Sequence, residues 1–285
     1  MNANAYDRIT ERITALLEQG TVPWRKPWTA KTAWPRNFTT RRPYRGINVF
    51  LLTAMSYESP FWLTFHQASE LGGKVRQGEK ACPIVFWKPL KIADEASGQE
   101  KHIPLLRLYH VFNVAQCEGL GEAPAVDVAL TPLKPAEIVA AMPDPPVIKH
   151  GMTAAFYAPR EDVVGLPHRE RFESTNSYFA TCFHELVHST GHEKRLHRST
   201  LSEHAGFGSD PYCKEELIAE MGAAFLCGYA EILDHTIASS AAYIQNWLAR
   251  IQHDKTLIVQ AAAQAQKAAD LILGRGIAEP AEAPP

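Results

Sequence analysis

The residues best suited to chemistry in this chain are His184, Glu185 and His188, which form the motif H-E-x-x-H within a helical pattern. Histidines four positions apart lie one turn apart on the same helix face, so both imidazoles can reach one metal ion. Glu185, next to His184, is placed to hold a metal-bound water, first as general base and then as proton donor to the leaving nitrogen. The motif therefore predicts a metallopeptidase site with Glu185 as its catalytic residue.

A catalytic zinc usually has three protein ligands and one open position. The best candidate for the third ligand is Glu216, on a second expected helix, in the segment KEELIAE. Glu220 lies one turn further along, and we expect it to accept the outer N–H of a ligating histidine. Glu220 is also the second candidate for the third metal ligand. Glu215 points about 100° away from Glu216 around the helix and is expected to be solvated.

The spacing also leaves other residues as candidates for the third metal ligand. The minor alternatives are Glu215 and the histidines that follow the motif, His192, His197 and His204. A metzincin site would need a histidine at position 194, where the chain has Lys194, so that class is excluded. The oxyanion stabiliser is not fixed by spacing, and its candidates are Tyr178, Tyr212 and His204. The predicted cofactor is one divalent metal, zinc first and manganese as the alternative, because the same ligands accept several ions.

Charge and aromatic residues are unevenly distributed along the chain. Residues 1–115 hold 16 Lys and Arg against 9 Asp and Glu, a balance of +7, whereas residues 116–285 hold 13 against 22, a balance of −9. Five of the six tryptophans also lie in the first 90 residues. This asymmetry indicates an anionic partner for the N-terminal half.

Cations interleaved with aromatic residues are typical of proteins that bind single-stranded nucleic acid, because cations follow the phosphates and rings stack on bases. The alternative is that the tryptophans belong to the core and the charges to a solvated face. The candidate DNA contacts are Trp24, Arg25, Lys26, Trp28, Arg41, Arg42, Tyr44, Arg45, Asn48, Lys74, Arg76 and Lys80.

The pattern of hydrophobic residues predicts a two-domain α+β protein. We expect an N-terminal domain over 1–117, a Pro- and Ala-rich linker with one short helix over 118–146, a mainly helical domain over 147–273, and a disordered tail over 274–285. Helices are expected at 5–19, 47–55, 65–71, 136–141, 175–190, 213–233, 237–251 and a last one ending at 273. Strands are expected at 81–90 and 105–114, with two more within 147–167, and 92–103 is expected to be a polar excursion.

Several classes are excluded by composition. The longest apolar run is about seven residues, far short of the roughly 20 needed for a membrane span, and the polar N-terminus has no secretory core. Five cysteines without a C-x-x-C pair indicate reduced thiols. We therefore expect a cytoplasmic protein with no membrane partner.

With both halves in view, the chain resembles ArdC-type antirestriction proteins along nearly its whole length. The N-terminal matches are LLEQGTVPWRKPW, TTRRPYRGINVFLL, LTFHQASELGGKVRQGEKACPIVFW and YHVFNVAQCEGL; the C-terminal ones are FHELVHSTGHEKRL and YCKEELIAEMGAAFLCGY. The loop LSEHAGFGSDPY departs from the family pattern, which leaves the substrate preference of the groove open.

The resemblance implies an N-terminal single-stranded-DNA-binding domain, shared with TraC-type plasmid primases, and a zincin-like metallopeptidase domain with Glu216 as third ligand. It also implies a plasmid-encoded protein that protects incoming DNA from host restriction during conjugation, in a bacterial donor or recipient cell. Its expected partners are single-stranded DNA and a protein or peptide substrate that the sequence does not identify. The alternative hypothesis is a DNA-binding protector whose metal site is structural or vestigial.

Overall fold

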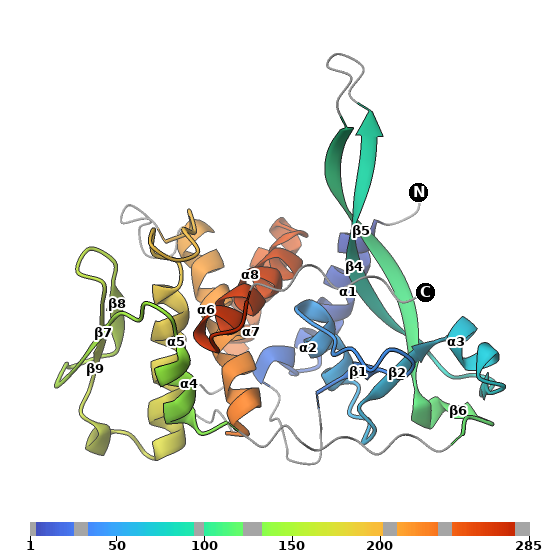
Figure 1. The fold of residues 1–285 in the computed structure, drawn as a ribbon, viewed down its shortest axis with the longest axis horizontal. Coiled ribbons are helices and arrows are strands. Elements are labelled where there is room, and N and C mark those ends of the chain that lie inside the picture. The colour runs from blue at the N-terminus through green and yellow to red at the C-terminus, as the bar shows by residue number, and fades with distance from the viewer. Residues whose placement is uncertain are drawn as a thin grey trace.

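The structure is a computed structural model that describes residues 4–25, 34–93, 100–121, 133–201, 210–232 and 241–276; side chains are not described for 88–93, 100–104 and 241. Several predictions fall outside these ranges. They concern the DNA contacts Lys26 and Trp28, the candidate His204, residues 122–132 of the linker and residues 277–285 of the tail. In the described ranges the fold is mixed, with sheets in the N-terminal part and mostly helices in the C-terminal part (Figure 1), which confirms the α+β prediction.

The N-terminal part is built on a four-stranded sheet in the order β1-β2-β5-β4. Strand β1 runs parallel to β2, and the other neighbours are antiparallel. A small two-stranded sheet, β3-β6, lies beside it. The elements are α1 (Ala5–Glu18), a 3-10 turn η1 (Pro23–Arg25), β1 (Arg36–Asn37), α2 (Ile47–Ala54), β2 (Phe61–Thr64), α3 (Phe65–Glu70), β3 (Lys74–Val75), β4 (Cys82–Ala93), β5 (Glu100–Asn113), η2 (Val114–Gln116) and β6 (Cys117–Glu118).

Strands β4 and β5 form a long two-stranded ribbon that projects from the body of the protein (Figure 1). Their pairing runs without a break from Cys82 opposite Val111 to Ala93 opposite Glu100. The expected polar excursion over 92–103 is therefore wrong at 92–93 and 100–103, which are strand, and residues 94–99 lie outside the described ranges. Polar composition suggested a loop, but backbone hydrogen bonds continue the antiparallel ladder regardless of side-chain polarity.

The C-terminal part combines a three-stranded sheet, ordered β7-β9-β8, with five helices in the described ranges. Two strands were expected here, and the structure has three, with β7 parallel and β8 antiparallel to β9. The elements are α4 (Pro135–Ala141), β7 (Val147–His150), β8 (Phe156–Ala158), β9 (Val163–Leu166), η3 (Arg169–Arg171), α5 (Thr175–Ser189), α6 (Asp210–Ala230), α7 (Ala241–His253) and α8 (Leu257–Ile272).

Helices α5 and α6 carry the metal motif and the candidate third ligand, and they pack unusually closely. A capping box at Ser174 starts α5, and Thr190 caps its end, just before Gly191. On α6, Gly222 faces Val187 of α5: a Cβ at Gly222 would lie 2.7 Å from a Val187 methyl carbon. Because Gly222 has no side chain, the backbones of α5 and α6 can approach each other beside the H-E-x-x-H motif.

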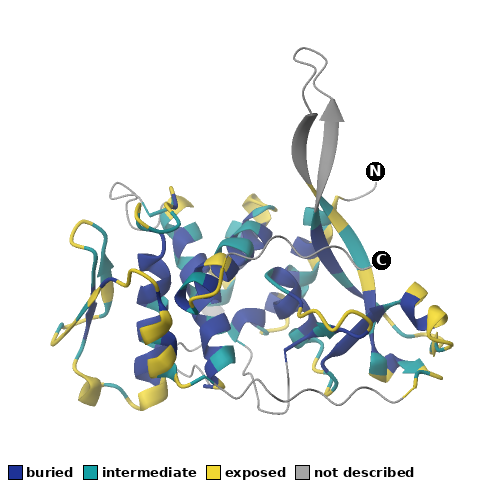
Figure 2. Ribbon diagram, in the orientation of Figure 1, coloured by how far each residue is buried: buried dark blue, intermediate teal, exposed yellow. Residues whose placement is uncertain are grey.

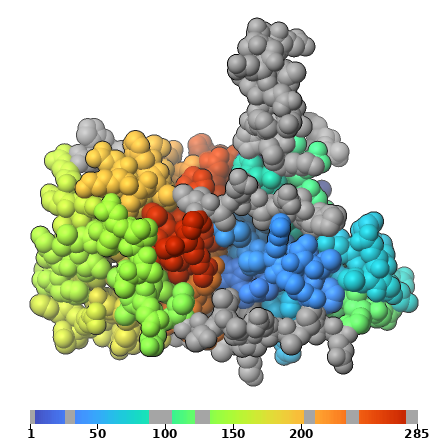
Figure 3. All heavy atoms as spheres, viewed as in Figure 1, coloured from blue at the N-terminus to red at the C-terminus, as the bar shows by residue number. Residues whose placement is uncertain are grey.

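The core joins the two halves. Buried residues concentrate where the sheet and helices meet (Figure 2), and aromatic rings of the N-terminal part stack on α6, Phe50 on Phe225 and Trp34 on Tyr229, with ring centroids 4.6 Å apart in both pairs. The red end of the chain, with α8, lies between the blue N-terminal part and the green and yellow C-terminal part (Figure 3). In the described ranges no helix is both long and apolar enough to cross a membrane.

Candidate metal centre

The two histidines of the motif face each other from successive turns of α5. Their Nε2 atoms lie 3.2 Å apart. From α6, the Glu216 carboxylate reaches both: its Oε2 lies 3.5 Å from Nε2 of His184, and its Oε1 lies 3.7 Å from Nε2 of His188. Among the described residues, these three form a cluster whose ligand atoms all lie within 4.8 Å of one another.

The two histidine nitrogens have the spacing of neighbouring ligands on a tetrahedral ion. Bonds of about 2.0–2.1 Å in that geometry separate ligand atoms by about 3.4 Å, and the Nε2 atoms lie 3.2 Å apart. Glu216 places one carboxylate oxygen near each nitrogen. The donor set, two imidazole nitrogens and one carboxylate oxygen, is that of a His₂Glu catalytic site. His184, His188 and Glu216 would therefore hold a divalent ion with a fourth position left open.

Glu185 lies next to this cluster with 8% of its surface exposed. Burial is the main cause that raises the pKa of its carboxyl above the ordinary value, although the neighbouring histidines oppose the rise. A carboxylate with a raised pKa accepts a proton more readily than an ordinary glutamate. The environment thus suits the general-base role predicted from the motif.

A second glutamate of α6, Glu215, contacts the other side of the His188 ring. Its Oε1 lies 3.4 Å from Nδ1 of His188. The same carboxylate accepts hydrogen bonds from Arg198 and Thr200, and both Glu215 and Arg198 are buried. With Nδ1–H donated to Glu215, the Nε2 lone pair of His188 is left to face the ion.

Charge partners keep Glu215 ionised. Burial alone would raise the pKa of its carboxyl, but hydrogen bonds from His188 and Arg198 outweigh it and lower the pKa to about 2. Arg198 is held in turn by Thr190 and by the Val187 carbonyl at the end of α5. The buried pair therefore ties the loop after α5 to both helices and fixes the ring orientation of His188.

The structure differs here from the expectation for Glu220. Its carboxylate accepts hydrogen bonds from Tyr243 and from Nε1 of Trp24, the latter at 3.1 Å, and it forms an ion pair with Arg25 at 3.6 Å. One turn of helix is about 5.4 Å, enough to carry Glu220 beyond the imidazoles and toward the N-terminal part. Glu215, expected to be solvated, is the carboxylate that contacts the ligating histidine.

The remaining candidates are placed as follows. Tyr212, one turn before Glu216, makes a side-chain hydrogen bond to it, and burial is the main cause that raises the pKa of this tyrosine to about 12. Tyr178 instead contacts His150, at 3.0 Å, and lies under the guanidinium of Arg169. Neither His192 nor His197 is part of the three-residue cluster. Glu215, Arg198 and Thr200 were missed because spacing along the chain does not show which side chains meet across the α5–α6 loop.

Three predicted DNA contacts are buried, which differs from the expectation that they face a ligand. Trp24 packs edge-on against Trp247. Burial raises the pKa of Tyr44 to about 12. The side-chain amide of Asn48 is hydrogen-bonded to both backbone groups of Val85. Their aromatic and amide groups complete the core and the domain contact, which composition could not distinguish from a binding face.

The other described candidates are half-buried or exposed. Arg25 is close over the Tyr243 ring, at 3.7 Å, and Arg45 forms an ion pair with the buried Asp270. The exposed ones are Arg41, Arg42, Lys74, Arg76 and Lys80. Of these, Lys74 pairs with Glu118 and Arg76 with Glu79. The structure thus divides the basic residues between the junction of the two halves and the solvent-facing surface.

Comparison with known proteins agrees with this geometry. Residues 3–112 match the N-terminal domain of the anti-restriction factor ArdC, and residues 138–264 match a zincin-like metallopeptidase domain. The metal-free crystal structure of the antirestriction protein ArdC from plasmid R388 is 40% identical and covers 94% of this chain and 96% of its own, with a TM-score of 0.75. The chain belongs to the ArdC antirestriction family.

Other members of the wider group extend the likeness. Two DNA primases TraC of Escherichia coli are 35% and 33% identical over 94% of this chain, which spans only 27% and 20% of their own length. An uncharacterized protein of Sinorhizobium fredii, y4eC, is 32% identical over 93% of this chain and 90% of its own. The R388 ArdC also has a Mn(II)-bound structure, with a TM-score of 0.75 to this chain. A divalent-metal site is thus a feature of an ArdC relative, and the cluster on α5 and α6 provides suitable ligands here.

Replacing each of the two flanking glutamates tests their division of roles. We expect Glu215→Gln to weaken Mn(II) binding by about 10- to 100-fold, because outer carboxylates that orient a ligating histidine have effects of that size. The matched variant Glu220→Gln should change Mn(II) affinity by less than about threefold, since Glu220 contacts Trp24 and Tyr243 instead. Calorimetric titration of both variants measures this, and the reverse order would contradict the assignment.

Metal binding should also compete with a proton on His184. Burial lowers the pKa of His184, but the hydrogen bond to Glu216 and nearby carboxylate charges outweigh it and raise the pKa above 6.5. Below the raised pKa the ring is protonated, so Mn(II) must displace a proton, and affinity falls as the pH falls. Titrations at pH 6 and pH 8 in buffers of different ionisation enthalpy should show weaker binding and more proton release at pH 6. Equal affinity and no release at both would contradict this.

Proposed function

We propose that this ArdC family member is a divalent-metal-dependent peptidase that also binds single-stranded DNA and protects incoming plasmid DNA from restriction. The observation that supports the peptidase most directly is the His184, His188 and Glu216 cluster, whose ligand atoms lie within 4.8 Å of one another, with Glu185 buried beside it. The match of residues 138–264 to a zincin-like metallopeptidase domain supports it independently. The substrate is a protein or peptide whose scissile carbonyl fits the open position.

The chain's own residues divide the reaction between them. A divalent ion held by this cluster supplies Lewis-acid chemistry, polarising a carbonyl and lowering the pKa of a water molecule. The Glu185 carboxylate takes the proton from the attacking water and returns it to the leaving nitrogen. Glu215 and Arg198 keep the His188 ring in one orientation, and Tyr212 restrains Glu216 through its hydrogen bond.

The DNA-binding role is supported by the match of residues 3–112 to the N-terminal ArdC domain and by the exposed cations of that region. Two exposed cations, Arg41 and Arg42, follow β1, and the guanidinium of Arg41 lies 4.9 Å from the Phe38 ring centroid. The Phe38 ring itself is buried, so the support comes from the exposed guanidinium groups, which can contact phosphates. DNA binding of this kind weakens with salt, because phosphate contacts release counterions.

The variant Glu185→Gln tests the proposed chemistry. It removes the base but leaves the three ligands, so Mn(II) and single-stranded DNA should bind as in the wild type. Cleavage of a mixed-sequence peptide library, followed by mass spectrometry, should fall by about 10²- to 10⁴-fold, the usual contribution of a general base. Glu193→Gln, at an exposed position after α5, is the matched control and should cleave normally.

The outcomes separate the two candidate roles. Full cleavage by Glu185→Gln, or no Mn(II)-dependent cleavage by the wild type, would refute the peptidase half. If Glu185→Gln then still protected transferred plasmid DNA as well as the wild type, protection would come from DNA binding with a structural metal site. Loss of protection together with cleavage would make proteolysis part of antirestriction.

A further inference from the structure

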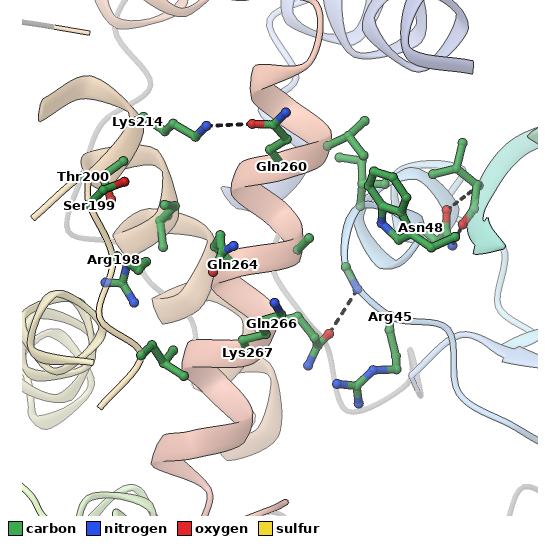
Figure 4. A pocket seen from close by; sticks show the side chains of 18 of the residues that line it. Arg45, Asn48, Arg198, Ser199, Thr200, Lys214, Gln260, Gln264, Gln266 and Lys267 are labelled. Atoms are coloured by element: carbon green, nitrogen blue, oxygen red, sulfur yellow. Dashed lines mark hydrogen bonds between the residues drawn. The ribbon is translucent and has the colours of Figure 1, made fainter. Parts of the chain in front are cut away.

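A groove of about 820 Å³ crosses α8 between the two halves of the protein. One wall comes from the N-terminal part, at Arg45 and the middle of β4 with Trp87. The opposite wall comes from Lys214 of α6 and the segment 196–200 after α5. Figure 4 shows α8 between the two walls, with Gln260 contacting Lys214 on one side and Gln266 contacting the backbone at Gly46 on the other.

The charge of the groove favours an anion. Four cationic side chains line it, Arg45, Arg198, Lys214 and Lys267, and none of the described lining residues is acidic. Arg45 and Arg198 each form an ion pair with a buried carboxylate, Asp270 and Glu215 respectively, which neutralises their charge. Lys214 instead contacts the amide oxygen of Gln260 at 2.7 Å, and Lys267 is exposed. Two lysines therefore supply the net positive charge on the surface of the groove.

The uncharged lining suits a nucleic acid better than an acidic peptide. Two half-buried glutamines of α8, Gln260 and Gln264, line the groove with amide groups, whereas Gln266 is buried and its amide is bonded to Gly46 and Asp270. Trp87, half-buried at the N-terminal wall, adds an aromatic surface. Lysines, amides and an aromatic ring together match phosphates and bases, as in proteins that bind single strands.

The groove also shares a wall with the metal centre. Arg198 and Thr200 both line it, and both donate hydrogen bonds to Glu215, the carboxylate that contacts Nδ1 of His188. A ligand that shifts the 198–200 segment would therefore act on the orientation of a metal-ligating histidine. Thr200 and Arg198, at the groove, are thus connected to the metal-ligating His188 through one side chain, Glu215.

We propose that single-stranded DNA lies in this groove, with phosphates at Lys214 and Lys267, and that its binding is coupled to metal binding through Thr200, Arg198 and Glu215. The proposal rests on the single-stranded-DNA binding proposed above and assigns it a path over α6 and α8, outside the N-terminal ArdC domain. The metal-domain helices then contribute directly to DNA affinity.

The double variant Lys214→Gln/Lys267→Gln tests the path in the full-length protein. Binding of a fluorescent dT oligonucleotide is measured across a salt series, where each phosphate contact contributes a slope of about −0.7 in log affinity against log salt. Losing two contacts should reduce the slope by about 1.4 and weaken binding at low salt. Lys134→Gln, at an exposed residue of the α4 N-cap, should leave the slope unchanged.

The results distinguish this proposal from the function on which it rests. No binding of the oligonucleotide by the wild type would refute the DNA-binding function itself. Wild-type binding with the same slope in the double variant would refute only the groove path. Poly-glutamate is the second probe: binding that depends on the two lysines, while DNA binding does not, would assign the groove to an acidic protein partner and overturn the proposal.

The coupling between DNA binding and metal binding is tested by a separate measurement. Mn(II) affinity, measured by electron paramagnetic resonance with and without saturating oligonucleotide, should change about fivefold or more. Thr200→Val keeps the side-chain shape but removes the hydroxyl that contacts Glu215, and it should reduce this change when measured at an oligonucleotide concentration that saturates the variant. Equal Mn(II) affinity with and without DNA would overturn the coupling.

Discussion

The geometry of the rest of the site depends on the contacts that the buried Glu215 carboxylate makes. It contacts the ligating His188 on one side and the guanidinium of Arg198 on the other, so the loop after α5 is fixed to both helices. Removing one partner of such a buried pair leaves an uncompensated charge and typically costs about 3–5 kcal/mol. The geometry of the metal centre is therefore tied to the folding of the segment around it.

Ion pairs and aromatic packing join the two halves of the chain. Glu220 and Asp270, on helices of the metal domain, form ion pairs with Arg25 and Arg45 from the N-terminal part. Trp24 donates a hydrogen bond to Glu220 and packs edge-on against Trp247 of α7. Basic residues that composition alone assigns to DNA thus hold the domains together. Because Glu216 is one turn from Glu220 on α6, the domain junction and the metal cluster share one helix.

Local patterns predicted the helices well and the side-chain partners poorly. The end of α5 before Gly191 and the meeting of Glu216 with the two histidines follow from helical spacing and the capping signal, with the family resemblance favouring Glu216. The observed contacts of Glu215 and Glu220 do not, because they depend on how α6 crosses α5. The length of the β4–β5 ribbon was missed for a similar reason, since its ladder forms between backbones.

A crystal structure of the Mn(II)-loaded protein, with the ion located by its anomalous scattering, tests the account most directly. It should place one ion at ligand distance from Nε2 of His184, Nε2 of His188 and an oxygen of Glu216, with Glu215 still on Nδ1 of His188. An ion bound by Glu220 or Glu215, or located away from α5, would contradict the assignment of the ligands and the orienting role of Glu215.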